Sequence, residues 1–134
     1  MIKQSEMMDN LDAFTSEYLP NATTAIENSL ILHWYPKRIV ERFGHCEGLL
    51  ELGIGHGHTA SIFNAACDRH LIVEGSQVVI NLFLENHPAF PAELVHDYFE
   101  SFETDDLFDV IVMGFILEHV DDPGVLLESY KKLL

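Results

Sequence analysis

The fold of this chain is decided by the stretch LLELGIGHGH, residues 49–58. It opens as an apolar run that carries one acid, Glu51, and glycines then follow at alternate positions, Gly53, Gly55 and Gly57. Glycine lets the backbone take φ values that other residues avoid, and it lets a ligand come close where a Cβ would otherwise stand. The stretch therefore predicts a strand that enters a ligand-binding turn.

Glycine clusters also mark ordinary loops, so the surrounding sequence decides between the two interpretations. A second apolar run, His70–Glu74, ends in an acid at about the 20-residue spacing at which α/β folds place a carboxylate on ribose hydroxyls. A third run, Glu93–Asp97, also ends in an acid. A fourth, Phe108–Phe115, is almost continuously apolar, as a strand covered on both faces should be. Four such runs separated by helical stretches predict a parallel sheet.

These motifs, in this order, resemble the class I S-adenosylmethionine-dependent methyltransferases of the small-molecule group. Glu51 and its glycines are similar to the family's first motif, whose loop wraps the methionine part of the cofactor and whose acid helps to hold the ammonium group. Glu74, followed by Gly75, falls where the second motif puts the ribose-binding acid. Asp97 falls at the third motif, whose acid accepts from the adenine amino group, and Tyr98 lines the ring.

The fourth motif is the most specific. The fourth apolar run leads into FILEHVDDP, residues 115–123, which is similar to the loop after the fourth strand of this group, down to the Leu-Glu-His-Val and Asp-Pro elements. The resemblance implies S-adenosylmethionine, or its demethylated product S-adenosylhomocysteine, as the cofactor. The cofactor-binding residues that it implies are Glu51, Gly53, Gly55, Gly57, Glu74, Gly75, Asp97, Tyr98 and Phe115.

The rival interpretation is a dinucleotide-binding Rossmann domain, and two features argue against it. The glycines follow Gly-x-Gly-x-Gly rather than Gly-x-Gly-x-x-Gly, and Glu51 stands two residues before the first of them. Its negative charge would repel a pyrophosphate, whereas it favours a cofactor that carries sulfonium and ammonium groups. The motif therefore favours the methyl donor.

We expect one domain over residues 1–134, an α/β three-layer sandwich of the Rossmann-like type with parallel strands in the order 3-2-1-4. The hydrophobic content of 48% is enough for one core. Residues 1–45 are expected to form an N-terminal helical cap, and residues 46–134 the cofactor-binding α/β part. In the family three more strands follow the fourth, whereas this sequence ends inside the predicted next helix, so we expect much of the usual acceptor site to be absent from it.

Three helices are expected in the N-terminal part, because Pro20 breaks the first of them and Pro36 suits the first turn of the third. Their predicted ranges are 11–19, 22–33 and 36–44. In the family such helices lie across the cofactor, so Tyr18, Trp34 and Tyr35 are placed to touch either ligand, although large aromatic residues more often fill the core.

The charge of the chain limits its partners. The formal net charge is −15, and no Lys or Arg occurs between Arg69 and Lys131. Nucleic acids and anionic membranes both draw affinity from basic side chains, so neither is expected to bind, and a small-molecule or neutral acceptor fits better. No apolar run approaches the about 20 residues that span a bilayer, and the start lacks the apolar core of a signal peptide, which predicts a cytoplasmic location.

Methyl transfer from a sulfonium is an in-line displacement that asks for alignment and, with some acceptors, removal of a proton. Glu118 and His119 are the base candidates near the methyl group, and the alternative is that Glu118 caps or pairs locally while His119 packs. His56 and His58 form a His-x-His pair, but a metal site needs three or four converging ligands, so we expect no metal.

Two further expectations concern partners and activity. The fourth strand, Val110–Phe115, would be an uncharged apolar edge, which favours a homodimer through this strand or through the C-terminal helix. The missing strands favour an alternative function, a non-catalytic binding or interaction module that keeps the methyltransferase fold. Turnover on an acceptor would distinguish this module from an enzyme.

Overall fold

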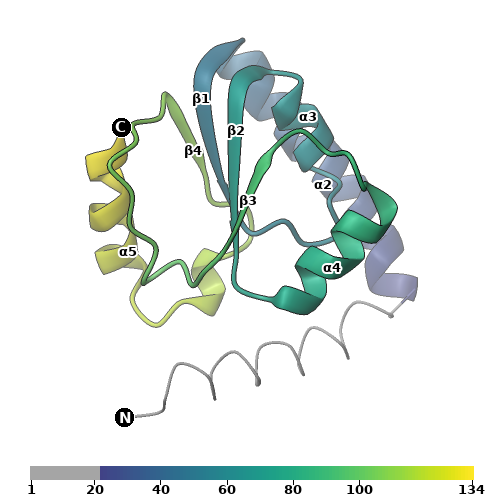
Figure 1. Ribbon diagram of the computed structural model, residues 1–134. Helices are drawn as coiled ribbons and strands as arrows, with labels where there is room; N and C mark the ends of the chain where they lie inside the picture. Colours follow the sequence, from purple (N-terminus) through teal and green to yellow (C-terminus); the bar gives the residue numbers. More distant parts are fainter. Residues whose placement is uncertain (1–21) are drawn as a thin grey trace.

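The computed structural model describes residues 22–134, so the helix predicted at 11–19 lies outside the described residues. A four-stranded parallel sheet runs through the centre in the order β3-β2-β1-β4, as predicted. Its strands are β1 (Cys46–Leu52), β2 (Cys67–Glu74), β3 (Glu93–His96) and β4 (Val110–Val112). Figure 1 shows three helices on one face, α2 (Ala22–Phe43), α3 (Ala60–Asn64) and α4 (Gln77–Asn86), and one, α5 (Pro123–Tyr130), on the other.

Both faces of the sheet are covered, which explains the continuous apolar runs in its strands. Successive side chains of a strand point to opposite faces. Leu50 and Leu52 of β1 therefore pack in a cluster with Leu126 and Tyr130 of α5. Leu49 packs in another cluster, against Phe63 of α3 and apolar side chains of α2. This two-sided core fixes the carboxyl ends of all four strands at one edge of the molecule.

Helix α2 is continuous from Ala22 to Phe43, so the prediction of two helices at 22–33 and 36–44 is wrong. Pro36 lies inside this helix and is fully buried. An interior proline removes one backbone hydrogen bond and costs ~3 kcal/mol. Here Tyr35, Ile39 and Val40 around it pack on the core beneath, and this burial offsets the lost bond.

Strand β4 is shorter than predicted, because it covers Val110–Val112 and not the whole run to Phe115. Its pairing with β1 ends at the partners Glu51 and Val112, one residue before β1 itself ends. Beyond this point Phe115 has a φ of 58°, in the left-handed region that strand residues do not adopt. The chain therefore leaves the sheet earlier than its apolar composition predicts.

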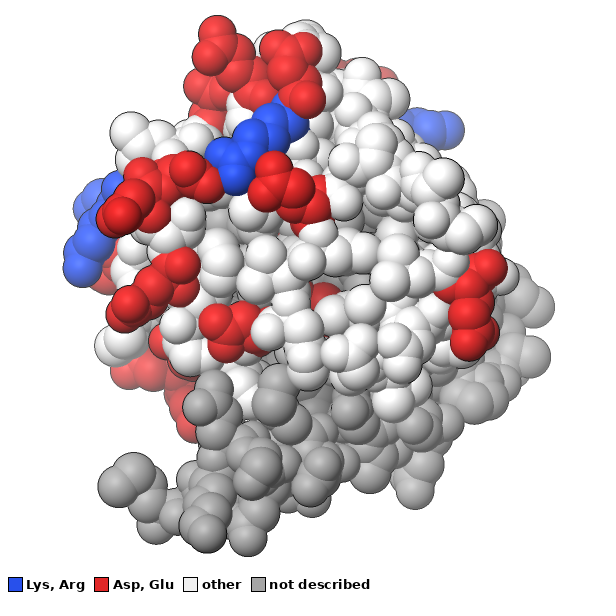
Figure 2. Space-filling view, in the orientation of Figure 1, with Lys and Arg blue, Asp and Glu red and all other residues white. Residues whose placement is uncertain are grey.

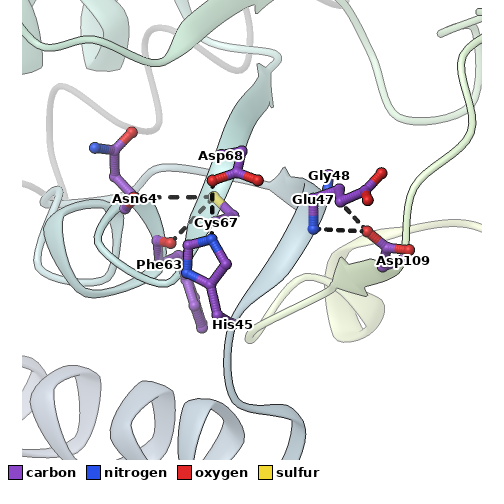
Figure 3. Close-up of polar contacts among 8 residues, drawn as sticks. All are labelled: His45, Glu47, Gly48, Phe63, Asn64, Cys67, Asp68 and Asp109. Carbon is purple, nitrogen blue, oxygen red and sulfur yellow. Dashed lines mark hydrogen bonds and ion pairs between the residues drawn. The ribbon is translucent and has the colours of Figure 1, made fainter.

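The amino end of the sheet is fastened by polar contacts near the surface (Figure 3). The Asp109 carboxylate accepts hydrogen bonds from the backbone N–H groups of Glu47 and Gly48, both at 2.9 Å. His45 Nε2 lies 2.9 Å from the Asp68 carboxylate. These contacts tie β4 and β2 to β1 at the end away from the glycine loop. Within residues 22–134, no helix is long and apolar enough to cross a membrane.

Candidate cofactor site

The glycine loop lies at the carboxyl end of β1, where open parallel sheets bind their ligands. Its three glycines all have positive φ. A Cβ on Gly57 would stand 2.6 Å from the Phe83 ring, so this glycine is needed for packing against α4. A Cβ on Gly55 would meet nothing within 4 Å, and Gly55 is exposed. The loop thus packs at Gly57 and presents open backbone at Gly55.

Glu74 connects this loop to the turn that follows β2. Its side chain is buried, with 8% relative exposure, and its carboxylate accepts hydrogen bonds from the N–H groups of Ile54 and Ser76, both at 2.9 Å. Burial raises the pKa of Glu74, and hydrogen bonds from the backbone of both segments oppose this rise. The structure therefore brings the predicted ribose acid directly against the predicted methionine loop.

Glu51 lies beneath the loop and not at its surface. It is 2% exposed, and its two carboxylate oxygens are each engaged: Thr59 donates its hydroxyl to one, and His70 Nε2 lies 3.0 Å from the other. Thr59 and His70 are therefore part of the site's support, and neither was predicted from the sequence. The signal that identifies His70 is its position two residues before Ile72, the register partner of Glu51, on the same face of the sheet.

Asp97 and Tyr98 follow β3, next to the end of β2. The Asp97 N–H donates to the Glu74 carbonyl, which places the two predicted acids at the ends of adjacent strands. The Asp97 carboxylate accepts hydrogen bonds from the Tyr98 N–H at 2.8 Å and from the Ser101 hydroxyl at 2.7 Å. Both predicted residues are half-buried, so this corner forms an ordered turn at the carboxyl edge of the sheet.

The segment after β4 carries the remaining predicted residues. Phe115 is 54% exposed and takes its positive φ without being a glycine, a strained conformation that clusters at functional sites. Its ring meets the Tyr35 ring edge-on, with centroids 5.5 Å apart. Glu118 and His119 lie in the short 3-10 helix η1 (Leu117–His119), and both are exposed at this end of the sheet.

Histidines gather on the other side of the glycine loop. The ring of His58 has two histidine neighbours. Its centroid lies 5.0 Å from that of His33 and 5.8 Å from that of His56. Burial lowers the pKa of His56 and His58, so their neutral forms are favoured. Over residues 22–134, no three His, Cys, Asp or Glu side chains are grouped to hold a metal ion.

A glycine loop after the first strand, with acids at the ends of the next two strands, defines a nucleotide-binding α/β domain of the Rossmann-like class. The sequence model described as "Methyltransferase domain" matches residues 50–134, and the chain belongs to this methyltransferase family. The predicted family is thereby confirmed. No curated protein matches the chain.

Solved structures share the fold. The chain is similar to the N-methyltransferase NodS from Bradyrhizobium japonicum WM9 in complex with S-adenosylhomocysteine, at a TM-score of 0.69 and 20% identity over 76% of this chain and 54% of NodS. The DhpI–S-adenosylhomocysteine complex matches with a TM-score of 0.73 and 21% identity over 98% of this chain and 63% of DhpI. The glycopeptide N-methyltransferase MtfA complexed with sinefungin matches with a TM-score of 0.65 and 23% identity. The match covers 76% of this chain and 45% of MtfA. The chain thus spans about half to two thirds of these proteins.

Proposed function

We propose that the chain binds S-adenosylmethionine and forms the cofactor-binding part of an enzyme that methylates a small or neutral acceptor. The observation that carries this proposal is the contact between Glu74 and the glycine loop, because it joins a carboxylate for ribose hydroxyls to open backbone at Gly55. Family membership supports it, as do the S-adenosylhomocysteine and sinefungin named in the structures of NodS, DhpI and MtfA.

Each part of the cofactor has a proposed place. Glu74, with Gly75, takes the ribose hydroxyls, and Asp97 with Tyr98 takes the adenine. The methionine part lies along the loop at Gly53, Gly55 and Gly57, and Phe115 covers the cofactor from the side of β4. Glu51 acts on the ammonium and sulfonium groups through its negative charge beneath the loop, since its oxygens are already hydrogen-bonded.

The electrostatics of the chain favour this ligand. Acidic side chains spread over the face seen in Figure 2, and the fewer basic ones lie at the top, the upper right and the left edge of that view. One of the basic residues, Arg69, is already paired with Glu93 and Asp106, at 3.1 and 2.6 Å. A negative surface attracts a sulfonium cofactor and repels the phosphates of nucleic acid. A small or neutral acceptor therefore remains the proposed substrate class.

The proposed chemistry places modest demands on the chain. The cofactor supplies an electrophilic methyl group, and the side chains hold it, exclude water and, where the acceptor needs it, remove a proton. The exposed Glu118 and His119 stand at the edge of the sheet where an acceptor approaches, and either is the proposed base. A second candidate function is cofactor binding without turnover, which needs only the contact between Glu74 and the glycine loop and the open backbone at Gly55.

Turnover separates these two functions. The chain is incubated with S-adenosylmethionine and either a panel of small amines and alcohols or an oligonucleotide, and S-adenosylhomocysteine is measured by mass spectrometry. The proposed enzyme forms the product with at least one small acceptor and none with the oligonucleotide. Binding without product from any acceptor supports the non-catalytic module, and product from the oligonucleotide contradicts the proposed substrate class.

A further inference from the structure

Glu51 is the centre of a buried hydrogen-bond network beneath the glycine loop. Thr59, at the far end of the loop, donates to one oxygen of its carboxylate, and His70 of β2 contacts the other. A buried carboxylate is costly unless its oxygens are hydrogen-bonded, so the network favours the one loop position in which Thr59 reaches Glu51. The loop therefore has an internal anchor in addition to its contact with Glu74.

Tyr35 brings helix α2 into this network. Its phenol hydrogen-bonds with the side chain of Thr59. The backbone after β4 also passes close to the phenol, since a Cβ on Gly114 would stand 2.1 Å from its oxygen. The ring of Tyr35 meets Phe115 edge-on. A single side chain thus touches the end of the loop after β1 and the segment after β4.

The protonation state of Tyr35 defines what it can do. Burial, followed by the negative charge of Glu51, raises the pKa of this phenol above its ordinary value, and the hydrogen bond with Thr59 opposes the rise. The phenol is therefore neutral at physiological pH and able to donate a hydrogen bond. A neutral phenol does not serve as the base that takes a proton from an acceptor.

We propose that Tyr35 is a positioning residue, which aligns the glycine loop with the segment after β4 by acting through Thr59 and Glu51. The inference rests on the proposed function, because these two segments hold the cofactor and flank the place where an acceptor would approach. In-line transfer depends steeply on alignment, and a shift of about 1 Å is enough to slow such a step about a hundredfold. The contacts of Tyr35 oppose a shift of this kind.

The test compares the half-buried Tyr35 with the buried Tyr130, on opposite faces of the sheet. Tyr35→Phe removes the hydroxyl and keeps the ring against Phe115. Tyr130→Phe is the matched control, because the Tyr130 hydroxyl donates to the Phe99 carbonyl at 2.8 Å, on the face covered by α5. In ligand-free protein, hydrogen exchange of peptides covering residues 53–60 should rise roughly three- to tenfold in Tyr35→Phe and stay at the wild-type rate in Tyr130→Phe, the effect of one hydrogen bond.

Thr59 provides a second, independent set of variants. Thr59→Val should speed loop exchange and weaken binding of S-adenosylhomocysteine by a similar factor, while Thr59→Ser, which restores the hydroxyl, should return both to wild type. If Tyr35 acts through Thr59, the double variant Tyr35→Phe/Thr59→Val is no worse than Thr59→Val alone. A merely structural role would give additive effects and no rescue by serine.

The two proposals fail in different ways. Wild-type loop exchange in both Tyr35→Phe and Thr59→Val overturns the positioning role, whatever the affinity for S-adenosylhomocysteine. Additive effects in the double variant also overturn it. Faster loop exchange in these variants, together with a wild-type protein that binds no S-adenosylhomocysteine, supports the positioning of the loop and overturns the proposed function instead.

Discussion

The carboxylates at the two ends of the sheet lie in opposite environments. At the amino end, Asp68 and Asp109 are exposed and bind a histidine ring and backbone N–H groups at the surface. At the carboxyl end, Glu51 and Glu74 are buried, and each needs several internal hydrogen bonds. Burying a carboxylate costs stability, so the difference supports our proposal that the carboxyl end holds a ligand, whereas the amino end holds strands together.

The largest expected effect on affinity is at the carboxyl end. Glu74→Ala should weaken binding of S-adenosylhomocysteine by about 1.5–3 kcal/mol, the range for hydrogen bonds to a charged group. Asp109→Ala, the control at the amino end, should leave the affinity unchanged while it lowers stability. Equal losses of affinity in both variants, measured by calorimetry, would abolish the distinction between the two ends.

Sequence reasoning predicted site residues at the carboxyl end of the sheet but missed the side chains that contact Glu51. The glycines, Glu74 and Asp97 were predicted from residue type, from their positions after apolar runs and from the family resemblance. Thr59 and His70 were missed, because their contacts with Glu51 depend on the register between β1 and β2 and on the path of the loop. That register is a property of the folded sheet, which no local pattern in one chain encodes.

Two elements differed from their predicted lengths for the same reason. Helix α2 continues through Pro36 because its apolar face packs on the sheet, a tertiary effect that overrides a local helix-breaking signal. Strand β4 ends at Val112, although its own sequence remains apolar to Phe115, because the chain turns away from the sheet there and Phe115 takes a φ of 58°. Composition identified both elements, and packing decided where they stop.

The largest expected effect on stability distinguishes a glycine at each end. Gly57→Ala should destabilise the protein by about 2–4 kcal/mol, since it combines a φ of 78° with a Cβ 2.6 Å from the Phe83 ring. Gly44→Ala, just before β1, has a similar φ of 75° but meets nothing within 4 Å, so it should cost only about 1 kcal/mol. Urea unfolding measures the loss of stability in both variants. Equal losses would show that the Phe83 ring moves aside for the new Cβ.

A smaller effect concerns pH. The folded state raises the pKa of Glu74 above its unfolded value, so the ionised form opposes folding. The contribution of Glu74 to stability is therefore present below about pH 4.5 and is lost as the pH rises through the folded pKa. Glu74→Gln should remove this part of the pH dependence of unfolding, whereas Asp109→Asn should keep it. A wild-type slope in Glu74→Gln would show that its backbone hydrogen bonds balance burial and leave its pKa unshifted.

The smallest expected effect lies at the sheet edge between the two ends. We propose that the chain forms a weak homodimer through β4 or through α5, whose Val125 is 67% exposed. Light scattering at about 100 µM, well above micromolar affinities, should show dimers in the wild type and fewer in Val125→Glu. A monomeric wild type at this concentration contradicts the dimer, and an unchanged Val125→Glu variant moves the contact from α5 to β4.

The central claim is that the buried acids at the carboxyl end serve a ligand, and calorimetric titration with S-adenosylhomocysteine tests it most directly. We predict saturable binding of one molecule per chain, weakened in Glu74→Ala and unchanged in Asp109→Ala. A chain that is folded by circular dichroism but gives no heat of binding at about 1 mM, the weak limit of specific affinity, would contradict the account.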